Sequence, residues 1–207
     1  MKVAVIANDE LREEFLSKET VHSANVCFVN SVQDVPADSY IVFDLLFEYS
    51  TERVALLKHF LPRPVFINAV TDTLAVIAEP FIRINAWPTF LGRTVTEIAV
   101  LTAQEKILPD VFEKLGWKYQ LVPDCIGMVS ARITGAIINE AYHTLQEGVS
   151  TKSEIDTAMK LGTNYPYGPF EWSEKIGLKK IQTMLSRLSE ENDLYEVSTL
   201  LTNEIIL

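Results

Sequence analysis

Residues 124–172 read DCIGMVSARITGAIINEAYHTLQEGVSTKSEIDTAMKLGTNYPYGPFEW, and this stretch decides how the second half of the chain folds. Its first part predicts one long helix, because apolar residues recur there at helical spacing. They are Val129, Ile133, Ala136, Ile137, Ala141 and Leu145. A second row, Gly127, Ala131 and Gly135, has small residues at every fourth position, which would let another backbone approach closely.

Capping signals divide the rest of this stretch into further helices. Gly148 is placed to end the long helix, since glycine readily takes the left-handed conformation at that position. Thr151 and Glu154 have the spacing of a capping box, which predicts a second helix that stops at Gly162. The sequence YPYGPF at residues 165–170 predicts a rigid turn before a third helix. Residues 123–207 are therefore expected to form an all-helical domain.

Residues 1–122 show a different pattern, in which short apolar runs alternate with helical segments. The predicted strands cover residues 2–7, 25–30, 39–46, 64–69, 81–86, 94–101 and 117–122. The predicted helices cover residues 9–18, a segment that starts at Ser50 or Thr51, and residues 73–78 and 104–115. Such alternation indicates an α/β domain with a mostly parallel sheet and helices on both of its faces.

The composition excludes several classes of protein. The net charge of −10 and the lack of a Lys/Arg cluster argue against a nucleic-acid binder. No apolar run is long enough to span a bilayer and no charged-then-apolar leader precedes the first strand, so we expect a cytoplasmic protein. Cys27 and Cys125 have neither metal-ligand spacing nor the density of a disulfide framework. Free thiols and no metal are therefore expected.

The helical stretch resembles the C-terminal domain of the 3-hydroxyacyl-CoA dehydrogenase family. The resemblance is carried by the sequences NEA at residues 139–141, QEGV at 146–149, DTAMKLG at 156–162 and YPYGPFE at 165–171. It implies a Rossmann-type NAD-binding domain at residues 1–122 and a helical domain at 123–207. It further implies an acyl-CoA or related small-molecule ligand, the NAD-dependent oxidation of a 3-hydroxyacyl-CoA in fatty acid metabolism, and a homodimer formed through the C-terminal helices.

The turn after the first predicted strand departs from the family pattern. Rossmann folds bind a dinucleotide with a Gly-rich turn, whose glycines let the backbone touch the pyrophosphate. Here that position is held by Asn8 and Asp9, and no glycine precedes Gly92. Asp9 and Glu10 would place negative charge near a diphosphate, whereas acidic residues in a first helical turn stabilise the helix dipole.

The resemblance also assigns catalytic and substrate positions. A glutamate that orients the catalytic histidine corresponds to Glu97, and the histidine position, twelve residues earlier, is held by Asn85. A serine that touches the substrate oxygen corresponds to Asp72. On the long helix, the family's asparagine–arginine pair corresponds to Ala131 and Arg132. Because an asparagine amide takes up no proton near neutral pH, Asn85 cannot replace the base, and Glu97 is expected to bond to Asn85 instead.

Two functions remain open from the sequence. The first is an enzyme of the dehydrogenase family, whose rate would be lowered by a factor of about 10² to 10⁴ through the loss of a general base. The alternative is a non-catalytic dimeric scaffold or small-ligand-binding module built on the same fold. A lower-ranking idea is that Asp72 and Glu97 form a carboxylate pair with a new acid–base role.

Overall fold

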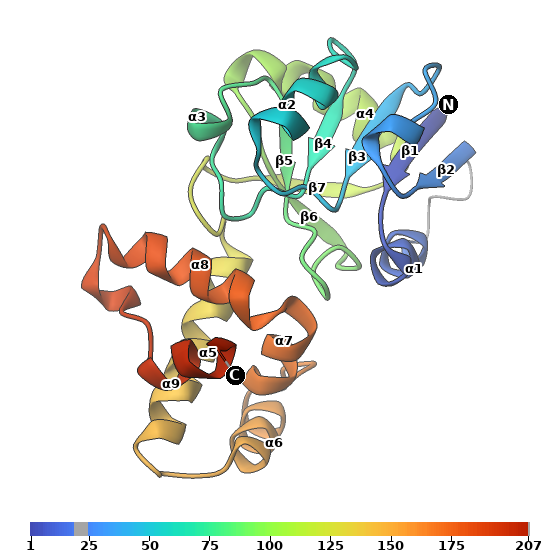
Figure 1. Cartoon of the computed structure of the whole chain (residues 1–207). Helices are drawn as coiled ribbons and strands as arrows, with labels where there is room; N and C mark the ends of the chain where they lie inside the picture. Colours follow the sequence, from blue (N-terminus) through green and yellow to red (C-terminus); the bar gives the residue numbers. More distant parts are fainter. Residues whose placement is uncertain (19–24, 207) are drawn as a thin grey trace. The chain divides into compact units, whose positions relative to one another are not determined.

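The computed structural model describes residues 1–18 and 25–206, and it divides the chain into two compact units (Figure 1). The first unit is Met1–Met128 and the second is Val129–Leu207. Residues 123–128, which the sequence places at the start of the helical domain, make their contacts within the first unit. No helix in the described ranges has the length and apolar character that crossing a membrane requires.

The first unit is built on a seven-stranded sheet, which confirms the α/β fold class and each of the predicted strands. The strands are β1 (Lys2–Ile6), β2 (Asn25–Val29), β3 (Ile41–Asp44), β4 (Val65–Ile67), β5 (Ile82–Ile84), β6 (Val95–Ala99) and β7 (Lys118–Leu121). Their order in the sheet is β2-β1-β3-β4-β5-β6-β7. All neighbours pair in parallel except β5 and β6, whose antiparallel register sets Ile84 opposite Ile98.

Helices cover both faces of this sheet because alternate strand residues are apolar on each side. Val3, Val5 and Phe43 face a core completed by α1 (Asp9–Ser17) and α4 (Leu108–Leu115). Ala4 and Val42 face the opposite core, completed by α2 (Thr51–Lys58), α3 (Leu74–Ile77) and the short 3₁₀ turn η2 (Val32–Asp34). The arrangement is the three-layer architecture expected of a Rossmann-like domain.

The helix predicted for residues 104–115 has two parts. Residues Thr102–Ile107 form a 3₁₀ segment, η3, and the α-helix α4 begins only at Leu108. Pro109 explains the break, because proline lacks the N–H that a helix interior needs and is well accommodated in a first turn. Gly116 ends α4 with a left-handed φ of 66°, as a C-terminal glycine should.

Arg83 on β5 is fully buried and binds the segment that leaves the first unit. Its guanidinium donates to the carbonyls of Ala69 (2.8 Å), Val70 (3.2 Å) and Cys125 (3.2 Å), and to Asp124 Oδ1 (2.5 Å). The same Asp124 carboxylate accepts from the backbone N–H of Leu74 at the start of α3. One side chain thus joins β5, the loop after β4, α3 and the residues that follow β7.

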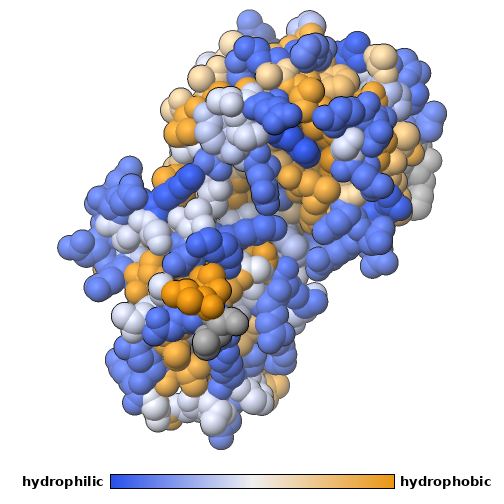
Figure 2. Space-filling model, in the orientation of Figure 1, coloured by the Kyte–Doolittle hydropathy of each residue, from blue (hydrophilic) through white to orange (hydrophobic). Residues whose placement is uncertain are grey.

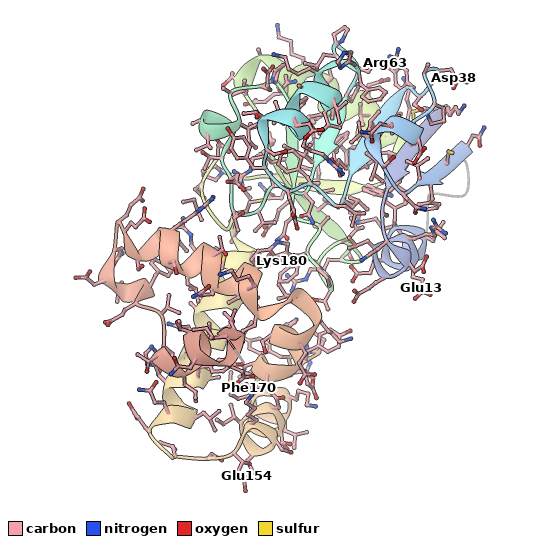
Figure 3. The ribbon with its side chains drawn as sticks, in the orientation of Figure 1. Glu13, Asp38, Arg63, Glu154, Phe170 and Lys180 are labelled. Carbon is pink, nitrogen blue, oxygen red and sulfur yellow. The ribbon has the colours of Figure 1, made fainter. Side chains whose placement is uncertain are left out.

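The second unit is all-helical, as predicted. It contains α5 (Ser130–Gln146), α6 (Lys152–Thr163), α7 (Pro169–Ile176), α8 (Leu178–Ser189), the 3₁₀ turn η4 (Asp193–Tyr195) and α9 (Thr199–Ile206). Thr151 and Glu154 form the predicted capping box of α6, where Figure 3 shows Glu154 projecting from the unit. Gly148 follows α5 with a φ of 71°. Gly162 does not end α6; Asn164 does, with a left-handed φ of 57°.

The two rows predicted on α5 face different surroundings. The row of small residues is buried: Ala131 has no exposed area, and a Cβ added at Gly135 would lie 2.3 Å from Met184 Cε of α8. Side chains of α8 therefore pack against this row, and the close approach of another backbone stays a prediction. Part of the larger apolar stripe instead reaches the surface, with Val129 43% and Ile133 56% exposed.

Asp156 of α6 accounts for the sequence pattern around the turn at residues 165–170. Its carboxylate accepts from the backbone N–H groups of Phe170 (2.8 Å) and Glu171 (3.3 Å), so it caps the neighbouring helix α7. A Cβ at Gly168 would lie 2.3 Å from Asp156 Cγ, so only glycine leaves room for that cap. Figure 3 labels Phe170, which is 3% exposed, within this unit.

We predict that Arg83→Met destabilises the protein by about 3–5 kcal/mol, because it removes the guanidinium hydrogen bonds to three carbonyls and leaves Asp124 without its cation. The free energy of unfolding is measured by urea titration. Lys114→Met, which removes an exposed i,i+4 ion pair with Asp110, is the control and should cost less than about 0.5 kcal/mol. Equal effects of the two substitutions would contradict the role given to Arg83.

We predict that Gly168→Ala lowers the free energy of unfolding by about 1–3 kcal/mol, because the added methyl group displaces the Asp156 cap. Gly162→Ala is the matched control in α6, where an added Cβ meets nothing within 4 Å. That control should stabilise the protein by about 0.5–1 kcal/mol through helix propensity. If the Gly168→Ala protein were as stable as the natural one, the Asp156 cap would not require a glycine at position 168.

Candidate functional site

The end of β5 and the middle of β6 bring Asn85 and Glu97 together. The antiparallel register places them opposite each other, and Asn85 N donates to the Glu97 carbonyl at 3.3 Å. Asn85 Nδ2 also donates to Glu97 Oε2 at 3.3 Å, and Asn85 Oδ1 accepts from the N–H of Trp87 at 3.4 Å. Asn85 is only 3% exposed. The side-chain bond expected from the sequence is therefore confirmed.

An amide at position 85 can hold a ligand oxygen but cannot remove its proton. The described histidines are elsewhere. His59 is exposed, with Nδ1 2.9 Å from the Ala55 carbonyl oxygen, and His143 lies in α5 of the other unit. His22 lies outside the described residues. The Asn85–Glu97 pair thus has the geometry of an oriented polar group.

Asp72 lies in the loop after β4 and is 7% exposed. Its Oδ2 accepts from the Thr71 hydroxyl at 2.9 Å. Its negative charge also acts on Arg83, where it opposes the lowering of the Arg83 pKa that burial causes. The carboxylate pair of Asp72 with Glu97 stays a prediction.

The turn after β1 has no phosphate-binding shape. Asn8 caps α1 with its own side chain, whose Oδ1 accepts from the N–H of Leu11 at 3.0 Å. The amide that a diphosphate would use is therefore already bonded. The Asp9 side chain is 98% exposed at the first turn, where it would repel a phosphate. At this turn, the residues present do not fit the pyrophosphate of NAD.

Further hydrogen bonds tie together the segments that follow the strands. Glu14 of α1 accepts from the backbone N–H groups of Thr89 (2.5 Å) and Gly92 (3.3 Å), in the loop after β5. Burial raises the pKa of Glu14, and these hydrogen bonds oppose the rise. Asn68, after β4, donates to the carbonyls of Leu45 and Ala86, which follow β3 and β5. The carboxyl ends of the strands, where such folds bind ligands, are thus linked by protein groups.

The sequence did not single out a buried ion pair at the end of β3. Asp44 has no exposed area, and Arg53 of α2 binds both of its oxygens at 2.7 Å. Burial raises the pKa of Asp44, while the guanidinium opposes that rise. The available signal was an aspartate at the end of the apolar run IVF, with an arginine in the next helix.

In the helical unit, the two positions assigned to substrate differ in access. Ala131 is fully buried, so its methyl group presents no surface for a ligand. Arg132 is half-buried, and its guanidinium carbon lies 5.8 Å from the centroid of the Tyr195 ring. It borders a cavity of about 450 Å³ whose wall includes Ile133, Leu185 and Leu194. Arg132 is therefore the accessible member of the pair. Within the described residues, no group of three or more His, Cys, Asp or Glu side chains could hold a metal ion.

The helical unit matches a known family. Residues 127–203 match the family model for the 3-hydroxyacyl-CoA dehydrogenase C-terminal domain. The chain is 40% identical over 88 residues to 3-hydroxyadipyl-CoA dehydrogenase of Escherichia coli, which covers 42% of this chain and 18% of that protein. It is 40% identical over 77 residues to 3-hydroxybutyryl-CoA dehydrogenase of Bradyrhizobium diazoefficiens, covering 37% of this chain and 26% of that one. The chain thus spans less than a third of the length of these two relatives.

Solved structures extend the likeness of the fold to the first unit. The (S)-3-hydroxybutyryl-CoA dehydrogenase PaaH1 of Ralstonia eutropha aligns with a TM-score of 0.74 at 19% identity, covering 99% of this chain and 93% of that one. The 3-hydroxybutyryl-CoA dehydrogenase of Escherichia coli aligns at 28% identity with a TM-score of 0.59, covering 68% of this chain and 31% of that one. Over residues 127–203, the chain is therefore similar to the C-terminal domain of the 3-hydroxyacyl-CoA dehydrogenase family.

Proposed function

We propose that this chain binds a 3-hydroxyacyl or 3-oxoacyl thioester as a dehydrogenase-like protein whose NAD-dependent turnover is strongly reduced. The observation that carries the proposal is the buried Asn85–Glu97 pair, with a 3.3 Å hydrogen bond at the family's catalytic positions. The Asn85 amide can donate to a carbonyl or hydroxyl oxygen, while Glu97 holds the amide in place. The pair can therefore orient a substrate oxygen without accepting its proton.

The reduction in turnover has two independent causes. A missing general base typically lowers the rate by a factor of about 10² to 10⁴. The turn at Asn8 and Asp9 adds a loss of cofactor affinity, because the Leu11 amide is already capped and Asp9 repels phosphate. A cytoplasmic location belongs to the same proposal and follows from the sequence expectation alone.

The test is a thermal-shift titration with acetoacetyl-CoA and with NADH, followed by a turnover assay with both. We expect acetoacetyl-CoA to raise the melting temperature, since a ligand at 100 times its Kd adds about 2.7 kcal/mol of stability. NADH should produce a smaller shift. The reduction of acetoacetyl-CoA by NADH should be at least about 10²-fold slower than it would be with a general acid to protonate the ketone oxygen.

Asn85→His serves as the control for the chemistry. A histidine at position 85 without a phosphate-binding turn should leave the rate of NADH oxidation low. Rapid turnover by that variant would refute the claim that the turn at Asn8 and Asp9 lowers cofactor affinity. If neither acetoacetyl-CoA nor NADH shifts the melting temperature, thioester binding is excluded and a scaffold function is left.

We further propose that two copies associate through the helical unit. Four apolar residues of α8 and α9 are not available for this, because Ile181, Met184, Leu185 and Leu201 are buried. The support comes from α5 and η4, where Ile133 is 56% and Leu194 85% exposed. Figure 2 also shows apolar surface near the C-terminus, where Ile206 is 78% exposed. Exposed apolar area of this kind is typical of an interface between copies.

Light scattering at micromolar concentration should give twice the chain mass. Ile133→Glu should produce a monomer, because a charge at the centre of an interface is costly to bury. Leu161→Glu, on the outside of α6 where Leu161 is 83% exposed, is the matched control and should stay dimeric. A monomeric natural protein would count against the dimer.

A further inference from the structure

Lys18 is a buried cation with an unusual set of partners. It directly follows α1 and is 7% exposed. Its Nζ donates to the Arg93 carbonyl at 2.8 Å and to Thr96 Oγ1 at 3.0 Å, and it lies 4.5 Å from the centroid of the Trp117 ring. Within residues 1–18 and 25–206, no carboxylate forms an ion pair with it. Lysines are rarely buried to this degree unless a negative charge accompanies them.

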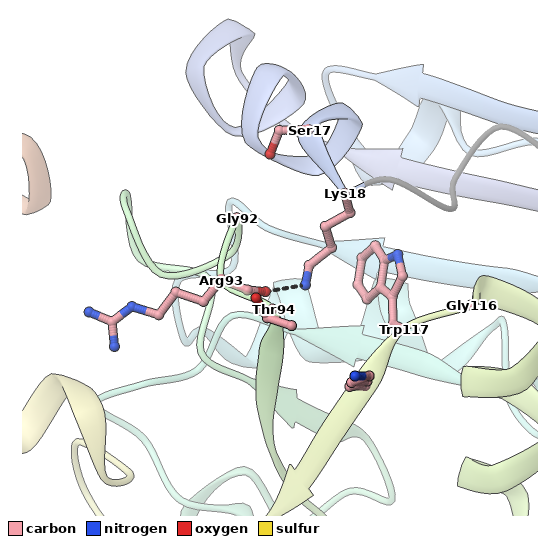
Figure 4. A pocket seen from close by; sticks show the side chains of 8 residues that line it. Ser17, Lys18, Gly92, Arg93, Thr94, Gly116 and Trp117 are labelled. Carbon is pink, nitrogen blue, oxygen red and sulfur yellow. Dashed lines mark hydrogen bonds between the residues drawn. The ribbon is translucent and has the colours of Figure 1, made fainter. Parts of the chain in front are cut away.

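The cavity beside Lys18 has the composition of an anion site. It measures about 420 Å³, within the range of small-molecule sites. Its lining residues are Ser17, Lys18, Gly92, Arg93, Thr94, Gly116, Trp117 and Lys118. No acidic residue is among them, although Asp and Glu outnumber Lys and Arg by 28 to 18 in the chain. Figure 4 shows the Lys18 side chain crossing the face of Trp117, whereas the Arg93 guanidinium points away from Lys18.

A second polar group in the wall has no partner. Trp117 is 6% exposed, and its Nε1–H is buried without a hydrogen-bond acceptor in the described part of the chain. A buried donor without an acceptor costs free energy, and an anionic oxygen is the acceptor that such a donor binds best. Burial lowers the pKa of Lys18 to about 8. A bound anion would supply the counter-charge that Lys18 lacks among the described residues.

We propose that this cavity binds a small oxyanion, the phosphate or carboxylate group of a small acid, with Lys18 as its counter-ion and Lys118 as a further donor. The site lies within the first unit, between the end of α1 and the starts of β6 and β7. It is separate from the Asn85–Glu97 pair and does not depend on thioester binding or NAD-dependent turnover.

The test is a titration with inorganic phosphate and, separately, with succinate, at constant ionic strength kept with sodium chloride. The chain has three tryptophans, so its indole N–H resonances in ¹H–¹⁵N spectra number three. We expect the Trp117 resonance to shift with saturation at millimolar anion, while those of Trp87 and Trp172 stay in place as internal controls. Saturation with phosphate alone or with succinate alone would identify the group that the site prefers.

Lys18→Met should raise the Kd for the anion at least about 10-fold, since it removes the buried positive charge. Lys114→Met is the matched control, because Lys114 is an exposed lysine of α4 that pairs with Asp110, and it should bind as the natural protein does. Lys118→Ala supplies a second variant should Lys18→Met fold poorly, and it should weaken binding several-fold. The proposal is overturned if the Trp117 resonance does not respond to tens of millimolar of either anion, or if both pocket variants bind unchanged.

Discussion

The buried guanidinium of Arg83 is the constraint on which the first unit depends. A charge with no exposed area is tolerated only when each of its nitrogens has an acceptor and an anion balances it. Arg83 meets both conditions by recruiting backbone carbonyls from two loops and the Asp124 carboxylate. Those partners come from widely separated parts of the sequence, so the network forms only when β5, α3 and residues 123–128 are all in place.

The carboxyl ends of the strands also have their backbone groups bonded by side chains, and in this they differ from a dinucleotide-binding site. In such a site, glycines leave backbone amides free for a phosphate. Here the backbone groups that follow β1, β3 and β5 are hydrogen-bonded by side chains of the protein itself. These side chains belong to Asn8, Glu14 and Asn68. The frame of the fold is kept because it depends on the apolar faces of the sheet, which are intact. Fold and chemistry are thus separable in this chain, as they are in many families that share a scaffold.

The sequence was informative where local signals act and weak where distant segments meet. The strands of the first unit and the capping box at Thr151 follow from short patterns, and all were predicted. The Asn85–Glu97 bond was also predicted, because the family spacing placed the two residues on adjacent strands. The contacts of Lys18 with Arg93 and Thr96, and of Arg83 with Asp124, are 41 to 78 residues apart in sequence, so no local pattern reveals them. Gly162 misled the prediction of the end of α6, because an asparagine two residues later adopts the left-handed conformation instead.

The backbone conformation of the last residues before α5 determines where the chain can be divided into its two units. Gly127 and Met128 both have positive φ, and the Gly127 N–H donates to the Val70 carbonyl at 2.8 Å. The polypeptide therefore changes direction while still bonded to the loop after β4. A shortened chain that stops at Pro123 would lose two acceptors of Arg83, Asp124 and Cys125, whereas one that stops at Met128 would keep all four. The boundary between the two units is therefore the peptide bond between Met128 and Val129.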